Sequence, residues 1–336
     1  MSETGGTPTL GFLFDVRNPL PWRRPWSTVI GESLDLITEV ERLGAGSVWA
    51  TEHHGFDDGY LSQPLTFLAA AAARTERVRL GTGVLLAALR HPRHISEQAA
   101  LVDNLSNGRL ELGIGAGYAV DEFEMFDKDR SRRMALADAA VRRLEDDLWR
   151  PGLLPPPVQD RIPLWMGYQG PQGARRAGRL GVGLLTTAPD LLEPYLAGLR
   201  EGGHDPATAA MGGLVPMILA VDPERTADKL APHWWHQSQT YARAHGAAPV
   251  ASPPHTELVA QLLDPAHRGL RVVTPRTAAR ELGSLIAGAP IRHLYFWASV
   301  AGMPSDVVAE HIGLVLTDLA SELPGCVRPS DTVVGW

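Results

Sequence analysis

Residues 77–124 decide the fold, and they read RVRLGTGVLLAALRHPRHISEQAALVDNLSNGRLELGIGAGYAVDEFE. An apolar run ends in glycine, and residues 94–105 then carry apolar side chains at helical spacing, which predicts a buried strand followed by a helix. Asn107 and Gly108 tolerate the left-handed conformation that ends a helix, and residues 110–114 predict a second buried strand. Because strand, helix and strand follow one another, this stretch predicts a βαβ unit and hence a parallel sheet.

The same alternation of strand and helix continues along the whole chain. Eight alternations predict an α/β protein folded as a single (β/α)8 TIM barrel over residues 1–336, with residues 223–271 as an insertion after strand seven and a candidate lid. The alternative is an open doubly wound sheet, but its glycine fingerprint is incomplete, since Tyr118 stands where the last glycine belongs. Apart from the quoted stretch, strands are expected at residues 9–15, 47–50, 162–166, 182–187, 214–221 and 291–297.

The composition is typical of a globular protein and argues against nucleic-acid or membrane partners. The 336 residues are 44% hydrophobic and 21% charged, and the formal net charge of −7 disfavours anionic partners. No apolar run reaches the roughly 18 residues that a membrane span needs. The N-terminal MSETGGTP has no signal region, so we expect a cytoplasmic protein. Cys326 is the only cysteine, which excludes an internal disulfide and a multi-cysteine metal site.

Function in a barrel gathers at the carboxyl ends of its strands, and here these ends carry histidines and glycines. The unperturbed imidazole pKa of about 6.5 suits proton transfer near neutral pH. Glycines let a flat or phosphorylated ligand lie against the backbone, and N–H groups at a helix start bind anions. The candidates are Glu52, His53 and His54 after the second strand, Gly83, Val84 and His91 after the third, Gly115, Ala116 and Gly117 after the fourth, and Gln169, Gly170 and Gly173 at the start of the fifth helix.

Structural interpretations of the same residues stay open. Adjacent residues of a strand point to opposite faces, so at most one of His53 and His54 should face the mouth, and either could serve the fold alone. A glycine turn also occurs where a helix simply packs closely on a strand. No HxH or HExxH spacing is present, so we predict no metal site. The absence of a G-x-S-x-G elbow and of a P-loop leaves serine hydrolysis and P-loop phosphoryl transfer unsupported.

The order of the segments resembles the bacterial luciferase-like flavin-dependent monooxygenases. The resemblance covers nearly the whole chain, rests on SVWATEHH, RVRLGTGVLLAALRHP, LVDNLSNGRLELGIGAGY and IPLWMGYQGPQGARRAGRLG, and is most specific between Trp49 and Tyr118. It implies a (β/α)8 barrel, commonly a homodimer, that binds flavin at its C-terminal mouth. It also implies that His53 is catalytic, that a non-proline cis peptide joins Gly83 to Val84, and that Gln169, Gly170 and Gly173 bind the flavin phosphate.

Two departures from the family pattern concern the phosphate. Ala116 stands where the luciferase has a phosphate-binding arginine, and Gly170 and Gly173 replace a serine and a threonine. Backbone N–H groups, with Arg175 or Arg176, would then have to hold the phosphate. The resemblance therefore implies either that FMN binds weakly, as a diffusible substrate does, or that the flavin is a different one.

Three functions follow from the resemblance. In the first, reduced FMN from a separate NAD(P)H-dependent flavin reductase reacts with oxygen to oxygenate a small organic substrate, with His53 as proton donor or acceptor and His91 and Glu52 orienting it. In the second, deazaflavin coenzyme F420 supports hydride transfer, with its polyglutamyl tail in a basic channel. That channel would contain Arg90, Arg93 and the arginines of residues 130–133. In the third, the barrel binds flavin or a lipid-like ligand without turnover, and the intact His53 and His91 argue mildly against this function. The sequence does not identify the substrate.

Overall fold

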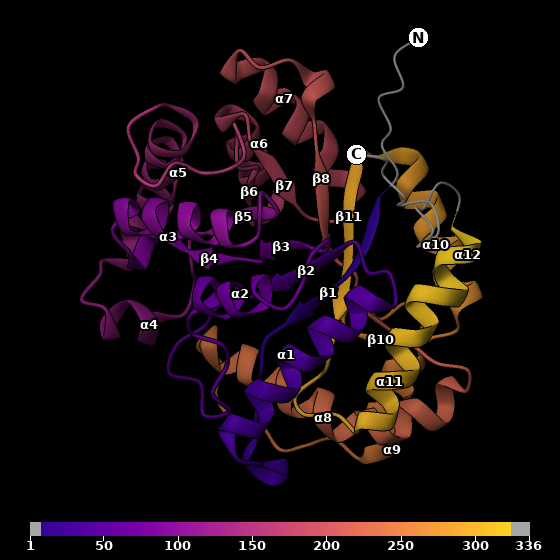
Figure 1. Cartoon of the computed structure of the whole chain (residues 1–336). Helices are drawn as coiled ribbons and strands as arrows, with labels where there is room; N and C mark the ends of the chain where they lie inside the picture. Colours follow the sequence, from indigo (N-terminus) through magenta and orange to yellow (C-terminus); the bar gives the residue numbers. More distant parts are fainter. Residues whose placement is uncertain (1–7, 324–336) are drawn as a thin grey trace.

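A closed barrel of parallel strands surrounded by helices forms the centre of the molecule (Figure 1). The computed structural model describes residues 8–323. The strands are β1 (Thr9–Phe14), β2 (Ser47–Ala50), β3 (Arg79–Thr82), β4 (Leu85–Leu86), β5 (Leu110–Gly115), β6 (Leu164–Met166), β7 (Gly183–Leu185), β8 (Met211–Leu214), β9 (Met217–Leu219), β10 (Arg271–Val273) and β11 (Ile291–Trp297). The helices are α1 (Trp26–Arg42), α2 (Pro64–Ala72), α3 (Pro92–Leu105), α4 (Val120–Met125), α5 (Arg133–Trp149), α6 (Gly170–Leu180), α7 (Leu192–Gly202), α8 (Pro223–Ala244), α9 (His255–Leu263), α10 (Pro275–Gly288), α11 (Ser305–Leu314) and α12 (Ala320–Glu322).

Strand pairing closes the barrel in the way that the sequence predicts. The first strand, β1, pairs in parallel with β2 and with the last strand, β11. Strands β1 and β11 lie side by side in Figure 1. The sheet runs in the order β3-β2-β1-β11-β8-β7-β6-β5-β4, and a further pairing of β3 with β5 completes the ring. The short β4 continues β3 after a break at residues 83–84. The predicted (β/α)8 TIM barrel is confirmed.

Aromatic side chains fill the interior of the barrel. Trp49 and Tyr295 stack with ring centroids 4.9 Å apart, and Trp165 lies in the same buried cluster. A Cβ atom on Gly81 would clash with the Trp49 ring, and one on Gly183 would clash with the Trp165 ring. These two strand positions therefore require glycine, because no other residue leaves room for the neighbouring indole.

The βαβ unit predicted within residues 77–124 is present. Helix α3 lies between β3 and β5, and its C-terminal end is followed by Asn107 at φ 53° and Gly108 at φ 81°. Both residues adopt the left-handed conformation predicted for them. Every residue of β5 is buried, as expected for a strand covered on both faces.

The seventh barrel strand differs from the expectation that it spans residues 214–221. The barrel uses β8, which begins earlier at Met211, whereas β9 leaves the barrel and pairs with β10 in a separate two-stranded sheet. Pro216 separates β8 from β9 and has no N–H for a ladder. Gly212 and Gly213 have low strand propensity, so the sequence pattern does not predict that the strand begins at Met211.

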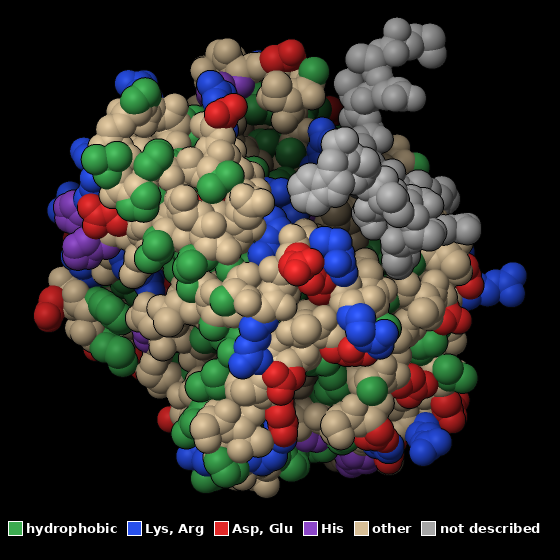
Figure 2. All heavy atoms as spheres, in the orientation of Figure 1, with side chains coloured by type: hydrophobic (Ala, Val, Ile, Leu, Met, Phe, Trp, Pro, Cys, Tyr) green, Lys and Arg blue, Asp and Glu red, His purple; other side chains and the backbone are tan. Residues whose placement is uncertain are grey.

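The predicted insertion, residues 223–271, forms mainly two helices. Asp222 caps α8 by accepting a hydrogen bond of 3.1 Å from the Arg225 N–H. Helices α8 and α9 pack together at one end of the barrel, at the bottom of Figure 1. An ion pair between Lys229 and Asp306 joins α8 to α11, and Figure 2 shows acidic and basic side chains interspersed over this face.

Within residues 8–323 no helix combines the length and the apolar character that a membrane span requires. The same residues contain no group of three or more His, Cys, Asp or Glu side chains placed to hold a metal ion. Cys326 lies outside the described residues.

The contact between α6 and α7 provides a test of the packing. A Cβ on Gly178 would clash with the Tyr195 carbonyl and lie 2.6 Å from the Leu199 nitrogen. We expect Gly178→Ala to lower the free energy of unfolding by about 2 kcal/mol in urea denaturation, because backbone atoms cannot move aside cheaply. Gly283→Ala is the control: no atom lies within 4 Å of its Cβ position in α10, and helix propensity predicts a gain of about 0.5–1 kcal/mol. Equal effects would contradict this packing.

Candidate active site

The ends of three neighbouring strands, β3, β5 and β6, meet at one mouth of the barrel. The side chain of Val84, after β3, lies over Gly115 at the end of β5, where a Cβ would clash with it. It also lies over Gly167 after β6, whose Cβ would be 2.6 Å from Val84 Cγ1. Val84 and Gly167 are half-buried, so this "Val84 ledge" is open on one side. The Gly83–Val84 peptide is cis, as the resemblance implies.

The start of α6 adjoins the Val84 ledge. Gln169 is the N-cap in an extended conformation, and its side chain makes no capping hydrogen bond. Gly170 has φ 70° with open space at its Cβ position, whereas Gly173 packs against Tyr168. A helix start without a side-chain cap is a site that an anionic group can bind.

Two arginines on α6 are paired with carboxylates. Arg175 pairs with Glu201 on α7, and the Arg176 Nε donates to Asp138 Oδ2 at 2.6 Å. Asp138 also accepts a 2.6 Å hydrogen bond from the Tyr168 hydroxyl, and burial together with this bond raises the Tyr168 pKa. Asp138 thus links Arg176 to Tyr168 in the loop before α6. Contact of Arg175 or Arg176 with a phosphate stays a prediction.

His53 is held between an acidic and a phenolic side chain. Its Nδ1 lies 2.6 Å from Glu122 Oε1, and its Nε2 lies 3.1 Å from the Tyr118 hydroxyl oxygen. A carboxylate can only accept, so the network places the proton on Nδ1 and leaves Nε2 to accept from Tyr118. The rings of Phe56 and Tyr60 pack on the imidazole with centroids 4.6 and 4.7 Å away. His53 therefore has a fixed orientation and tautomer.

Glu122 is a site residue that the sequence analysis missed. It lies on the short helix α4 and is 1% exposed, and its Oε1 also accepts the His54 N–H at 2.9 Å. One signal could have found it: the acidic pair Asp121-Glu122 lies three residues after the GAGY turn, in the first turn of a helix close to a predicted functional strand end. We expected Glu52 and His91 to orient His53, whereas the side chain that lies against its Nδ1 is Glu122.

Glu52 faces away from His53. Its carboxylate accepts the Leu86 N–H at 2.9 Å, lies 2.6 Å from His54 Nε2 and pairs with Arg90. These bonds hold the segment after β3 in place. Of the two adjacent histidines, His54 thus contacts Glu52, whereas His53 contacts Tyr118. The alternation of side chains along an extended backbone explains the separation.

His91 lies apart from this group. It is exposed at the N-cap of α3, where its Nδ1 accepts the Arg93 N–H at 3.2 Å. Its ring centroid lies 5.8 Å from that of His94. The strand ends thus bring His53 and the glycine positions to one mouth but do not bring His91 to His53.

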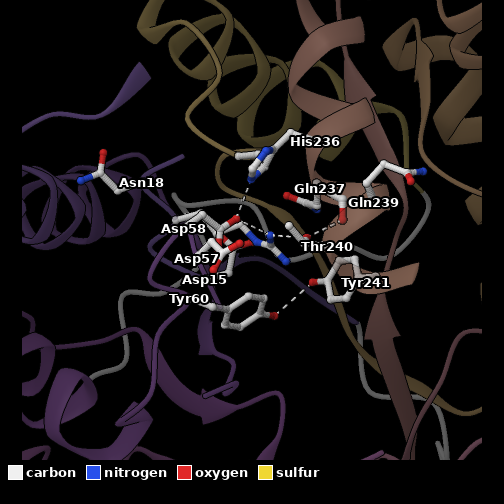
Figure 3. Close-up of polar contacts among 12 residues, drawn as sticks. Asp15, Asn18, Asp57, Asp58, Tyr60, His236, Gln237, Gln239, Thr240 and Tyr241 are labelled. Atoms are coloured by element: carbon white, nitrogen blue, oxygen red, sulfur yellow. Dashed lines mark hydrogen bonds and ion pairs between the residues drawn. The ribbon is translucent and has the colours of Figure 1, made fainter. Parts of the chain in front are cut away.

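A second buried polar cluster, also absent from the sequence analysis, joins the segments after β1 and β2 to α8 (Figure 3). Its neighbours Tyr60 and Tyr241 pack on the His53 ring. Arg17 Nη1 donates to Asp58 Oδ2 at 2.6 Å and to Thr240 Oγ1 at 2.7 Å, and Arg17 Nε donates to Asp15 Oδ2 at 3.1 Å. His236 of α8 lies 3.0 Å from Asp58. Asp15 and Arg17 directly follow β1, which is where barrel function is expected, so their position was a usable signal.

Burial controls the electrostatics of this Arg17 cluster. Burial raises the pKa of Asp15 to about 6, against the opposing charge of Arg17 and with help from Asp58. Burial acts on Asp58 in the same direction, but hydrogen bonds from His236 and Arg17 prevail and lower its pKa. One guanidinium thus compensates two buried carboxylates, and the cluster depends on it.

Helix α8 covers this side of the mouth. The Tyr241 hydroxyl lies 3.1 Å from the Tyr60 hydroxyl, and the His245 ring stacks on Tyr118 with centroids 4.0 Å apart. The Arg17 guanidinium lies 4.8 Å from the Tyr241 ring centroid. Aromatic and polar contacts therefore join α8 to the residues that surround His53. The function of the insertion as a lid stays a prediction.

Comparison with known proteins places the chain in a family. Residues 18–284, more than half of the chain, match the family model described as luciferase-like monooxygenase. The chain belongs to the luciferase-like monooxygenase family. Limonene 1,2-monooxygenase of Rhodococcus erythropolis is 35% identical over 130 residues, 37% of this chain and 34% of that protein. An F420-dependent glucose-6-phosphate dehydrogenase of Amycolatopsis mediterranei is 30% identical over 197 residues, 53% of this chain and 59% of that protein. The matches thus span about a third to three fifths of these relatives.

Solved structures of luciferase-like proteins share the barrel. The monooxygenase RslO1 from Streptomyces bottropensis has a TM-score of 0.73 and 25% identity, with 92% of this chain and 97% of that chain covered. The oxygenating constituent of 3,6-diketocamphane monooxygenase from Pseudomonas putida, in complex with FMN, has a TM-score of 0.68 at 18% identity, with 94% and 99% covered. The relatives that the chain matches include proteins named as a monooxygenase and as F420-dependent dehydrogenases.

The Arg17 cluster predicts a pH-dependent stability effect. Arg17→Met leaves Asp15 and Asp58 without their buried cation, and we expect the free energy of unfolding at pH 7 to fall by about 3–5 kcal/mol. A folded-state pKa of about 6, above the ordinary 3.8, means that the contribution of Asp15 is present below pH 3.8 and lost as pH rises through 6. Removing Arg17 raises that pKa further, so the deficit should be larger at pH 8 than at pH 5.

Arg24→Met is the matched control for this measurement, because Arg24 forms an exposed ion pair with Glu32. An exposed pair contributes about 0.2–1 kcal/mol, and no comparable pH trend is expected. A deficit in Arg17→Met that is small, or that shrinks as pH rises, would show that the cluster is not held by this compensation.

Proposed function

We propose that the chain is the oxygenase component of a two-component flavin-dependent monooxygenase. It takes reduced FMN from a separate NAD(P)H-dependent flavin reductase and uses oxygen to oxygenate a small organic substrate. A homodimer, as the resemblance implies, is part of the proposal. The observation that carries it is the position of His53, fixed between Glu122 and Tyr118 at the same barrel mouth as the Val84 ledge.

The residues present fit a flavin. The half-exposed Val84 side chain, backed by Gly115 and Gly167, offers a flat apolar surface for an isoalloxazine ring. The uncapped start of α6 at Gln169 and Gly170 offers backbone N–H groups to a phosphate. Reduced FMN supplies the chemistry with oxygen when bound.

The chain's own residues provide orientation and proton handling. Glu122 fixes the Nδ1 proton of His53, so Nε2 can accept or, once protonated, return a proton toward Tyr118 and the site. The packed rings of Phe56, Tyr60 and Tyr241 keep water from the imidazole. The description of the diketocamphane neighbour as an oxygenating constituent supports a separate reductase.

Coenzyme F420 is the second candidate cofactor, supported by the F420-dependent dehydrogenases among the relatives. The basic channel expected for its tail is weaker than the sequence suggests: Arg90 pairs with Glu52, and Arg93 pairs with Glu97 and Asp147. Arg130, Arg132 and Arg133 form no ion pair among residues 8–323, and the Arg130 Nε donates to the Tyr118 carbonyl, so part of the expected basic channel keeps its charge. Parallel titrations of the wild-type protein with reduced FMN and with reduced F420 test the choice directly.

Substitution of His53 tests its proposed function in proton transfer. With a flavin reductase, NADH and a substrate found by screening, we expect His53→Ala to lower oxygenated product by about 10²–10⁴-fold, the usual contribution of a general acid or base. Reduced-FMN affinity should stay close to wild type in a fluorescence titration. His94→Ala, an exposed histidine on α3, is the control. Unchanged turnover in His53→Ala would exclude His53, and a wild type that binds flavin without turnover would favour a binding protein.

Substitution of Gly115 tests the Val84 ledge. A methyl group at position 115 would clash with Val84 Cγ2 and displace the ledge. We expect Gly115→Ala to raise the Kd for reduced FMN by about tenfold, a cost of about 1.4 kcal/mol. Gly31→Ala on α1 is the control, since nothing lies within 4 Å of its Cβ position. Equal affinities in the two variants would place the flavin elsewhere.

A further inference from the structure

A small cavity lies beside Glu122, between the segment after β2, helix α4 and the C-terminal end of α8. Its volume is about 220 Å³, and its walls include Phe56, Glu122, Thr240 and Arg243. Asp57 and Asp121, both exposed, form part of its rim. The cavity therefore has an exposed acidic rim, and one of its lining residues, Glu122, carries a buried carboxylate.

The two carboxylate oxygens of Glu122 differ in their surroundings. Oε1 lies 2.6 Å from His53 Nδ1 and accepts the His54 N–H at 2.9 Å. Oε2 is buried and has no hydrogen-bond partner among residues 8–323. A buried polar atom without a hydrogen-bond partner lowers the free energy of unfolding by about 1–3 kcal/mol. If Glu122 only held His53 in place, leaving Oε2 unpaired would bring this cost and no benefit. An oxygen that exchanges protons with water in the adjoining cavity does need to be free.

We propose that Glu122 relays protons between this cavity and His53; the proposal rests on the proposed function, in which His53 handles a proton at the barrel mouth. When Nε2 of His53 takes up a proton, the Nδ1 proton passes to Glu122 Oε1, and the imidazole becomes neutral again. A half-turn of the carboxyl group presents this proton to the cavity, where water accepts it and the carboxylate is restored. The reverse sequence delivers a proton to His53.

The titratable and charged groups around Glu122 come from three segments of the chain. They are His53, His54 and Asp57 after β2, Tyr118 and Asp121 before and on α4, and Arg243 on α8. His54 contacts Glu122 through its backbone, while its side chain is occupied by Glu52. Burial raises the Tyr118 pKa, which makes this phenol a hydrogen-bond partner and a poor outlet to solvent. Glu122 is thus the group that joins His53 to the cavity.

Solvent exchange of the His53 Nδ1 proton tests the relay in the protein without cofactor. With isotope-labelled histidine, NMR saturation transfer from water gives the exchange rate of this proton in wild type, E122Q and E124Q. We expect E122Q to slow exchange by about tenfold or more, because an amide keeps the shape of the side chain but cannot carry the proton. E124Q removes an exposed carboxylate from the same helix and should exchange at the wild-type rate.

Formate provides a second readout that a merely structural function of Glu122 would not give. The cavity has room for formate, which should restore exchange in E122A while leaving wild type and E124Q unchanged; E122Q alone carries the test if E122A fails to fold. Fast exchange in E122Q, or equal acceleration by formate in wild type, would overturn the relay. Titration with reduced FMN separates the two proposals: a protein that shows the exchange effects but binds no flavin disproves the proposed function and retains the relay.

Discussion

The arrangement of the barrel mouth depends on the burial of one guanidinium. Arg17 brings the segment after β1, the segment after β2 and helix α8 to one place, because Asp15, Asp58 and Thr240 are its partners. A buried cation cannot remain without such partners, and two buried carboxylates cannot remain without the cation. The resulting cluster fixes α8, whose Tyr241 lies next to the residues around His53. Residues of α8 therefore contact the site residues directly.

Two kinds of constraint meet at the mouth. On the Val84 side, Gly115 and Gly167 lack side chains and leave the ledge accessible. On the His53 side, every ring nitrogen has a partner and the imidazole is enclosed by aromatic rings. An open apolar ledge suits a planar ligand that enters and leaves, whereas a fixed imidazole suits a group that must hold one tautomer. This division supports a cofactor that is exchanged with a partner protein instead of being held permanently.

The chain belongs to the luciferase-like monooxygenase family, whose matching relatives include a protein named as a monooxygenase and others named as F420-dependent dehydrogenases. The local charges add information that the comparisons lack. Arginines that looked available for a phosphate or a polyanionic tail are paired with carboxylates: Arg90 with Glu52, Arg175 with Glu201 and Arg176 with Asp138. Because these three arginines are paired, the backbone N–H groups at the start of α6 are the donors left for an anion there.

The sequence by itself determined the barrel, the βαβ unit around α3 and the strand ends that meet at the mouth. These features follow from apolar periodicity and from glycines that local conformation requires, and both are properties of neighbouring residues. The tertiary structure decided that β8 starts at Met211, that Glu122 and not Glu52 contacts His53, and that Arg17 pairs with Asp58 and Thr240. These partners are separated by tens to hundreds of residues, and only the closure of the barrel and the packing of α8 bring them within hydrogen-bonding distance.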